Sequence, residues 1–362
     1  MKAVHEGGCF VIRGEFRPAE SRLYVLHDTI APALGSVDDR PAVHPDEFKP
    51  YTALGPIAEF KRTAPNAFLL DVCQYRIGSE RWSAPKEVWR AQKELRERLG
   101  MRTVHANGNL QRHLWVHEPH PKDGEPVCFR FQFEVTDAPA GQVRLALEQG
   151  EQYAVTLNGQ SAGLDGGWYM DRCMKTFVLP DVRRGINELE LFCAYTARFE
   201  LEDAFLLGDF AVDEQRTLIN EPDKLRFGDW CLQGYPHYCG SMRYALDVEL
   251  EAVDSHRYLL EIGAIQGVLA VLYINGSLVR KLPWQSEYAL EISEAVFEGR
   301  NQIEVEVVGS PRNLLGPVHL ARTDDTWEDW WSYRPEGADY TSEYVLQPYG
   351  LMSQIHIRRC AK

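Results

Sequence analysis

The chain has 362 residues, with 39 Lys and Arg against 53 Asp and Glu, so its formal net charge is −14. This acidic balance argues against nucleic acid as a partner, because affinity for phosphate backbones comes largely from Lys and Arg. Hydrophobic residues make up 44% of a chain long enough for two or three domains, yet no apolar run reaches the roughly 18 residues of a membrane span, so no membrane partner is expected.

Residues 1–125 predict a small α+β segment that begins like the remnant of an upstream domain. Two short alternating runs, 9–13 and 21–26, are typical of a hairpin, but a hairpin of this size cannot bury a core alone. The runs either pair with later strands or close a preceding domain. Residues 28–65 are rich in Pro, Asp and Ala and predict an irregular connector.

The second half of this segment predicts a strand and a helix. Residues 68–77 are typical of a strand, and the helix is expected over 84–99. Ser83 fits the N-cap, and Pro85 suits the first turn, where its missing N–H costs nothing. Gly100 is expected to end the helix.

Most of the remaining chain predicts two β-modules, module A over 126–212 and module B over 226–321. In module A, Phe129, Phe131 and Phe133 alternate with polar residues, so that one face of the strand points into a core. Turn signals at short intervals between such strands favour a sandwich or a jelly roll. The predicted fold is therefore mostly β, with two tandem jelly-roll or β-sandwich modules behind the small N-terminal α+β segment.

Three phrases occur in the same order in both modules: an Asn-Gly pair, a Gly-x-Asn before a strand, and Leu-Leu-Gly. An Asn-Gly pair between alternating runs favours a type I′ hairpin turn, which needs φ > 0 at both central residues. The repeated order indicates one module used twice. The modules should then superpose with Asn158 on Asn275, Asn187 on Asn301 and Gly208 on Gly316.

The tail, 322–362, is expected to pack back on the sandwiches. It begins with the aromatic-rich residues 327–333. It ends in a strand-like run at 354–358. Aromatic side chains carry large apolar surfaces, so a tail of this composition favours burial against the modules.

The eight cysteines form no Cys-x-x-Cys pair and show no regular spacing. We interpret them as mostly free thiols of a reducing compartment, although their even number leaves disulfides open. The first residues do not lead into a signal peptide, which favours a cytoplasmic location if Met1 is the natural start. No cofactor is expected, and no metal site either, because the histidines within 113–120 lack an evident fourth zinc ligand.

The start of module B carries the pattern Trp-x-x-Gln-Gly-Tyr-Pro-x-Tyr-x-Gly over residues 230–240, followed by the three repeated phrases. This order resembles the galactose-binding-like β-sandwich modules of large glycoside hydrolases, in particular family 2 sugar-binding domains and the C-terminal region of family 106 rhamnosidase-like enzymes. Residues 17–26 resemble the Pro-Gly-Glu-Ser segment that closes an upstream domain in such enzymes, with Ala19 in place of the Gly. The resemblance covers most of residues 66–350.

The resemblance implies catalytic carboxylates on a separate (β/α)₈ barrel, which needs roughly 200 residues or more. No segment of that length remains outside the two modules, so no catalytic residue is assigned. The leading interpretation is a non-catalytic carbohydrate-binding or accessory region of a glycoside hydrolase-like protein, with an upstream catalytic domain as partner if the chain is a fragment. The alternatives are an intact glycoside hydrolase with unidentified carboxylates and a purely structural or interaction protein.

Sugars are bound by aromatic rings that stack on their C–H faces and by polar groups that bind their hydroxyls. In the Gly-hinged loop of module A, neighbouring strand residues face opposite sides, so only one of Trp168 and Tyr169 is expected to be presented. Packing in the core is the alternative role for these aromatic residues, and Trp230 is expected to be a core anchor. The candidate carbohydrate-binding residues are Trp168, Tyr169, Asp171, Tyr235, His237, Tyr238, Trp284 and Asn313.

Overall fold

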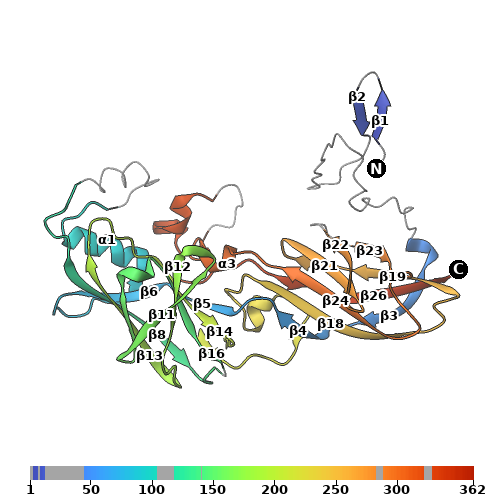
Figure 1. Ribbon diagram of the computed structural model, residues 1–362, viewed down its shortest axis with the longest axis horizontal. Coiled ribbons are helices and arrows are strands. Elements are labelled where there is room, and N and C mark those ends of the chain that lie inside the picture. The colour runs from blue at the N-terminus through green and yellow to red at the C-terminus, as the bar shows by residue number, and fades with distance from the viewer. Residues whose placement is uncertain are drawn as a thin grey trace.

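The computed structural model describes residues 45–103, 118–139, 141–282, 288–321 and 328–362, and the backbone of a hairpin of β1 (Ala3–Glu6) and β2 (Cys9–Ile12). The fold is mostly β, as predicted, and two β-sandwiches lie side by side along the long axis of the molecule (Figure 1). Sandwich A is formed by the described residues between 66 and 219, namely 66–103, 118–139 and 141–219. Sandwich B is formed by residues 49–62, 225–282, 288–308 and 350–361, and residues 311–321 and 328–349 make up a bridging segment.

Sandwich A is one hydrogen-bonded path of strands that folds over on itself through β11 (Gln160–Tyr169). Its first layer contains β6 (Val72–Ile77), β8 (Glu125–Val135), β13 (Gly185–Tyr195) and β10 (Ala154–Leu157). Its second layer contains β12 (Asp171–Val178), β9 (Arg144–Glu148), β14 (Ala204–Gly208) and β5 (Asn66–Leu70). The short strands β7 (Lys86–Glu87), β15 (Ala211–Val212) and β16 (Thr217–Ile219) extend the first layer.

Sandwich B has two separate sheets. The first contains β17 (Leu225–Arg226), β4 (Ile57–Arg62), β18 (Ser241–Leu250), β24 (Gly299–Val308), β21 (Leu269–Ile274) and β22 (Ser277–Leu282). The second contains β23 (Tyr288–Glu291), β19 (His256–Ile262), β26 (Ile355–Ala361) and β3 (Lys49–Leu54). The two-residue strands β20 (Ile265–Gln266) and β25 (Gly350–Leu351) pair beside them.

The two sandwiches share a strand order. The neighbours β6–β8–β13–β10–β11 in sandwich A correspond to β4–β18–β24–β21–β22 in sandwich B, and β12–β9–β14–β5 correspond to β23–β19–β26–β3. They are nested in the chain, however, because β3 and β4 of sandwich B precede all of sandwich A. The strands of residues 49–77 thus complete both sandwiches instead of forming a separate segment, and β26 of the tail lies inside a sheet. Alternation shows that a strand is half-buried, but not which strand it joins.

The two Asn-Gly hairpins carry the same hydrogen bonds. Asn158 and Asn275 both have φ of 51°. Their Nδ2 atoms donate to Oδ1 of Asn187 and Asn301, at 2.9 Å in each case. Both acceptor asparagines are fully buried, and their Nδ2 atoms donate over 2.7 Å to the carbonyl oxygen four residues earlier. The sequence therefore correctly matched Asn158 with Asn275 and Asn187 with Asn301.

The third predicted pair is not equivalent. Gly208 ends strand β14, whereas Gly316 follows the one-turn helix α3 (Arg312–Leu315) of the bridging segment and has φ of 83°. By strand order, the counterpart of β14 is β26, which lies more than thirty residues further along the chain. A Leu-Leu-Gly phrase is too short to specify a strand, because the same three residues also suit the last turn of a helix with a glycine after it.

We expect Asn187→Ala and Asn301→Ala to destabilise the protein by similar amounts, roughly 2 to 3 kcal/mol each. Each change leaves buried backbone groups without their hydrogen-bond partner, and the two networks are the same. The check is urea unfolding of both variants beside Asn220→Ala, whose side chain is exposed and whose loss should change stability by about 0.5 kcal/mol or less. A large effect in only one sandwich would contradict the equivalence.

The helix expected over 84–99 is α1 (Val88–Arg98), and it covers the edge of sandwich A (Figure 1). It begins later than predicted because Ser83 is not its cap. The Ser83 Oγ instead accepts a hydrogen bond from the backbone N–H of Tyr75 at 3.0 Å, which keeps the following residues beside β6. Gly100, with φ of 68°, ends the helix as expected. No helix in the described parts of the chain is long and apolar enough to cross a membrane.

Candidate functional site

Four of the predicted binding residues are fully buried between the sandwiches. Tyr235, His237, Tyr238 and Asn313 each have an exposed fraction of 0%. They lie where the chain crosses between sandwich A and sandwich B, a region we call the seam. A saccharide cannot reach these side chains in this structure, so the pattern at residues 230–240 serves the packing of the fold. Trp230 is equally buried, as expected of a core anchor.

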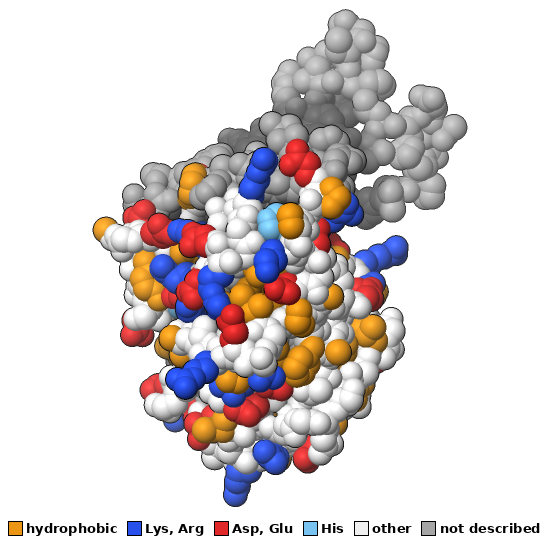
Figure 2. Space-filling view, turned by 90° about the vertical axis from the view of Figure 1, so that its left-hand side faces the viewer, with side chains coloured by type: hydrophobic (Ala, Val, Ile, Leu, Met, Phe, Trp, Pro, Cys, Tyr) orange, Lys and Arg blue, Asp and Glu red, His pale blue; other side chains and the backbone are white. Residues whose placement is uncertain are grey.

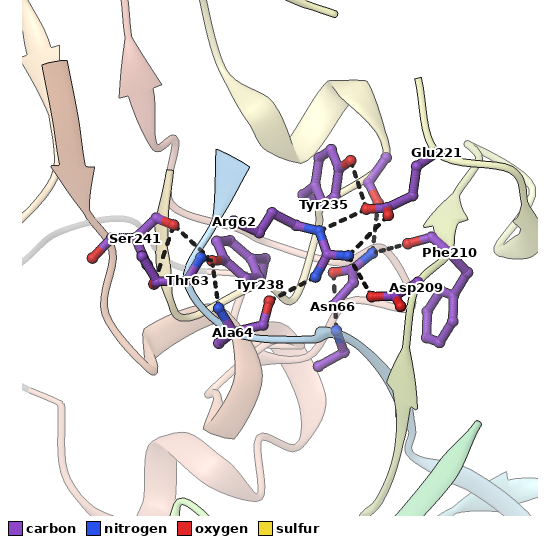
Figure 3. A network of polar contacts seen from close by, with 12 residues as sticks. Arg62, Thr63, Ala64, Asn66, Asp209, Phe210, Glu221, Tyr235, Tyr238 and Ser241 are labelled. Atoms are coloured by element: carbon purple, nitrogen blue, oxygen red, sulfur yellow. Dashed lines mark hydrogen bonds and ion pairs between the residues drawn. The ribbon is translucent and has the colours of Figure 1, made fainter. Parts of the chain in front are cut away.

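Arg62, at the end of β4, is the centre of the seam (Figure 3). Its guanidinium donates to both carboxylate oxygens of Glu221, from Nε at 2.6 Å and from Nη2 at 2.8 Å. Nη2 also donates to Asp209 at 2.9 Å, and Nη1 donates to the carbonyl of Ala64 at 2.6 Å. Because Ala64 lies on the outward crossing of the chain and Glu221 on the return, one side chain holds both crossings together.

The two predicted tyrosines complete this network (Figure 3). The Tyr235 hydroxyl donates to Glu221 at 2.9 Å. The Tyr238 hydroxyl donates to the carbonyl of Ser241 at 2.7 Å and accepts from the backbone N–H of Thr63 at 3.1 Å. Their phenol groups are thus satisfied by the protein itself, which is the usual requirement for a buried polar atom.

His237 links the bridging segment to sandwich A. Burial, and then the charge of Arg216, lowers the pKa of His237 to about 4, so the imidazole is neutral. Its Nδ1–H donates to the carbonyl of Asn313 at 2.8 Å, and its Nε2 accepts from Arg216 at 3.2 Å. Asn313 in turn exchanges two hydrogen bonds with the backbone of Gln347, at 2.7 and 2.8 Å. The neutral ring therefore has a structural role.

Asp71 is the most enclosed of the ionised groups at the seam, with 6% of its side chain exposed. It accepts from His319 Nε2 at 2.8 Å and from the Tyr344 hydroxyl at 2.7 and 2.9 Å, and Arg216 lies 3.6 Å away. Burial alone would raise the pKa of Asp71, but the hydrogen bond from His319 and the charge of Arg216 outweigh it, and the pKa lies below its usual value. The same contact raises the pKa of His319 against the opposing effect of burial.

A second carboxyl beside this group invites comparison with a glycosidase acid pair. Burial, and then the charges of Asp71 and Glu202, raise the pKa of Asp203 well above its usual value. One protonated and one ionised carboxyl are what glycoside hydrolysis uses. Only 6% of the Asp71 side chain is exposed, however, so a sugar cannot reach its oxygens in this structure. The arrangement joins the bridging segment to sandwich A and does not form a catalytic pair.

The predicted loop of sandwich A has a different character. Trp168 in β11 is 56% exposed, whereas Tyr169 turns inward and its hydroxyl lies 3.1 Å from Cys239 Sγ of sandwich B. Asp171 is exposed and accepts from the backbone N–H of Cys173 at 2.9 Å. Trp284, the remaining candidate, lies outside the described residues. Among the predicted residues that are described, Trp168 and Asp171 are therefore the two exposed to solvent.

A pocket of about 450 Å³, not expected from the sequence, lies on the outer face of the first layer of sandwich A. The strand register places one row of side chains across β6, β8, β13 and β10, namely Arg76, Cys128, Phe192 and Ala154. The turn at 150–153 adds to the lining. The end of the molecule formed by sandwich A mixes basic and acidic side chains with small hydrophobic patches (Figure 2). The alternation in β6 indicates that Arg76 faces outward. The pocket could not be predicted from β6 alone, because it depends on small side chains from other strands.

No protein-family model and no curated protein matches the sequence. Among solved structures, the chain is similar to a rhamnosidase from Novosphingobium sp. PP1Y, with 18% identity over 66% of this chain and 23% of that chain and a TM-score of 0.29. A Bifidobacterium dentium β-glucuronidase has 16% identity over 38% and 25% of the two chains, with a TM-score of 0.28. A Dictyoglomus thermophilum β-D-mannosidase has 13% identity over 68% and 31%, with a TM-score of 0.27.

These three proteins are glycoside hydrolases, and this chain spans 23%, 25% and 31% of their lengths. With identities of 13 to 18% and TM-scores of 0.27 to 0.29, the likeness to these proteins is weak and partial. It assigns no activity to the chain.

Proposed function

We propose that this chain is a non-catalytic accessory region of a glycoside hydrolase-like protein and that sandwich A binds carbohydrate through Trp168. The observation that carries this proposal is the 56% exposure of an indole on an anchored hairpin. An indole offers the largest stacking face of any side chain and an N–H for a hydroxyl.

The hairpin of β11 and β12 supports such a role because its other side is held by the protein. Tyr169 contacts Cys239, and Met170 Sδ lies 3.6 Å from the same thiol. The register between the two strands shifts on both sides of Trp168, which bends the hairpin at this residue. A ring presented by an anchored element loses little freedom when a sugar stacks on it, and this favours binding.

Two features of the described residues support the non-catalytic part of the proposal. The described residues contain no (β/α)₈ barrel, and the enclosed carboxylate of Asp71 is bound by three protein groups. The catalytic step would then belong to a partner domain, which we propose to be a glycoside hydrolase domain of the same protein.

Trp168→Ala is expected to abolish saccharide binding with little change in melting temperature. A shallow site desolvates little, so we expect the wild type to bind with a dissociation constant near the millimolar end of the scale, about −4 kcal/mol. Calorimetric titration against monosaccharides and plant oligosaccharides, beside thermal melts, measures both quantities.

Leu164→Ala is the matched control, because Leu164 is in the same strand and 47% exposed. It should bind as the wild type does. Unchanged binding by Trp168→Ala, or a large loss of stability in that variant, would contradict the proposal.

A further inference from the structure

The pocket on sandwich A is built from a row of small side chains between two larger ones. Cys128 and Ala154 belong to the row of Arg76 and Phe192, and the next row across the same strands contains Gly78, Pro126 and Ala194. Small residues in the middle of an outward face leave space that longer side chains would fill. The resulting volume, about 450 Å³, lies within the range of small-molecule sites.

Arg76 is the basic residue of this pocket, and its guanidinium is held in place without being neutralised. Its Cζ lies 4.5 Å from the centre of the Trp82 ring, so the group is stacked on an indole. The Cys128 thiol lies beside the guanidinium, but the buried Nε has no hydrogen-bond partner among the described residues. Arg76 also forms no ion pair with any residue that the structure describes. A buried donor without a partner costs free energy that a ligand acceptor would recover.

The neighbouring arginine shows what a satisfied guanidinium looks like on this face. Arg130 stacks on the same ring, with its Cζ 4.3 Å from the centre. It donates to Gln74 at 2.7 Å and lies 3.5 Å from a carboxylate oxygen of Glu188. Arg76 has the same aromatic support, but within the described parts of the chain it has neither an amide nor a carboxylate as partner.

The remaining lining suits a hydroxylated ring. Phe192 offers an apolar surface, and Glu151 and Gln152 offer polar groups on the adjoining turn. Cys128 adds no reactive group, because burial, and then the charge of Glu190, raises the pKa of its thiol to about 12. We propose that this pocket binds a carboxylated saccharide, a hexuronate unit, whose carboxylate pairs with Arg76 and whose ring lies over Phe192.

Arginine is the side chain best matched to a carboxylate, because its planar fork donates two parallel hydrogen bonds. This inference takes from the proposed function only the idea that the ligand is a saccharide. The site itself is separate from Trp168. Arg76 is in β6, whereas Trp168 belongs to the hairpin of β11 and β12.

The test is calorimetric titration of the full chain with D-galacturonate and, as the neutral counterpart, with methyl α-D-galactoside. The wild type is expected to bind galacturonate more tightly. Arg76→Gln is expected to weaken galacturonate binding about tenfold or more, since it removes a charge-assisted pair, and to leave any binding of the neutral sugar unchanged. Added salt should weaken the wild-type interaction with galacturonate.

Two further variants keep the test independent of folding effects. Ala154→Tyr should block galacturonate by filling the pocket from an exposed position. Arg144→Gln removes the same charge from the other layer of sandwich A, where Arg144 pairs with Asp165 at 3.0 Å, and should bind as the wild type does. Thermal melts establish that all variants are folded.

Three results would overturn the inference: no binding of galacturonate by the wild type, equal binding of the two sugars, or wild-type affinity in Arg76→Gln. Trp168→Ala separates this inference from the proposed function. If the wild type binds no neutral saccharide, and Trp168→Ala keeps galacturonate binding that depends on Arg76, the pocket stands and the Trp168 site fails. If neutral sugars bind through Trp168 and galacturonate binding does not depend on Arg76, the Trp168 site stands and the pocket fails.

Discussion

Replacing Asp71 with alanine is expected to lower the free energy of unfolding by about 3 to 5 kcal/mol, because breaking a buried ion pair leaves its partners uncompensated. The change removes the acceptor of His319 and Tyr344 and the carboxylate beside Arg216. Urea unfolding measures the difference. The control is Asp247→Ala, whose carboxylate pairs with Arg300 at the surface and has 47% of its side chain exposed, and about 1 kcal/mol or less is expected there.

The same contribution should depend on pH in both directions. The pKa of Asp71 is lowered in the folded state, so its stabilisation is present above the ordinary carboxyl pKa of about 4 and is lost as pH falls through the folded value. The pKa of His319 is raised, so its stabilisation is complete below about 6.5 and is lost as pH rises through the folded value. The stability difference between wild type and Asp71→Ala should therefore be largest between about pH 4 and 6.5. A difference that does not change with pH would show that the carboxylate is not paired in solution.

Trp230→Ala is expected to cost about 3 to 5 kcal/mol, the usual loss for a large aromatic ring removed from a core. The ring is fully buried and stacks on Tyr349 with 5.6 Å between ring centres and an angle of 17°. It also meets the edge of Tyr238 at 5.8 Å. Because the cavity left by alanine lies inside sandwich B at the seam, we expect the two sandwiches to lose their shared packing as well.

Trp230→Phe separates ring volume from hydrogen bonding. The indole Nε1 is buried and has no hydrogen-bond partner in the described chain, so phenylalanine loses volume but none of the hydrogen bonds seen there. It should cost no more than about half as much as alanine. Urea unfolding of both variants beside Trp168→Ala tests this, and similar losses for Trp230→Ala and the exposed Trp168→Ala would contradict the assignment of these two residues to core and surface.

Much of the fold was predictable because it depends on local patterns. The alternation of Phe129, Phe131 and Phe133 correctly marked an inward face, since all three are buried. The Asn-Gly turns marked two hairpins, and Asn158 and Asn275 have the positive φ that such turns require. Backbone conformation and strand periodicity are set by neighbouring residues, so they can be inferred from a few positions at a time.

The candidate site was less predictable. Aromatic side chains near turns suit both a sugar site and a core, and sequence could not separate Trp168, which is exposed, from Tyr235 and Tyr238, which are buried. The pocket beside Arg76 was not anticipated, since its lining comes from β6, β8, β13 and β10, which are distant in the chain. The exposure of a side chain depends on which other segments pack around it, so it cannot be inferred from one segment of the sequence.

The sequence by itself determined the kind of element along most of the chain: mostly strands, one helix ending at Gly100, and two hairpins with matching asparagines. Only the tertiary structure decided that sandwich A is inserted between β4 and β17 of sandwich B, and that Arg62 joins the two crossings. The physical reason is that alternation and turn chemistry act between neighbours in the chain. Strand partners and buried ion pairs are selected by packing and burial over the whole molecule.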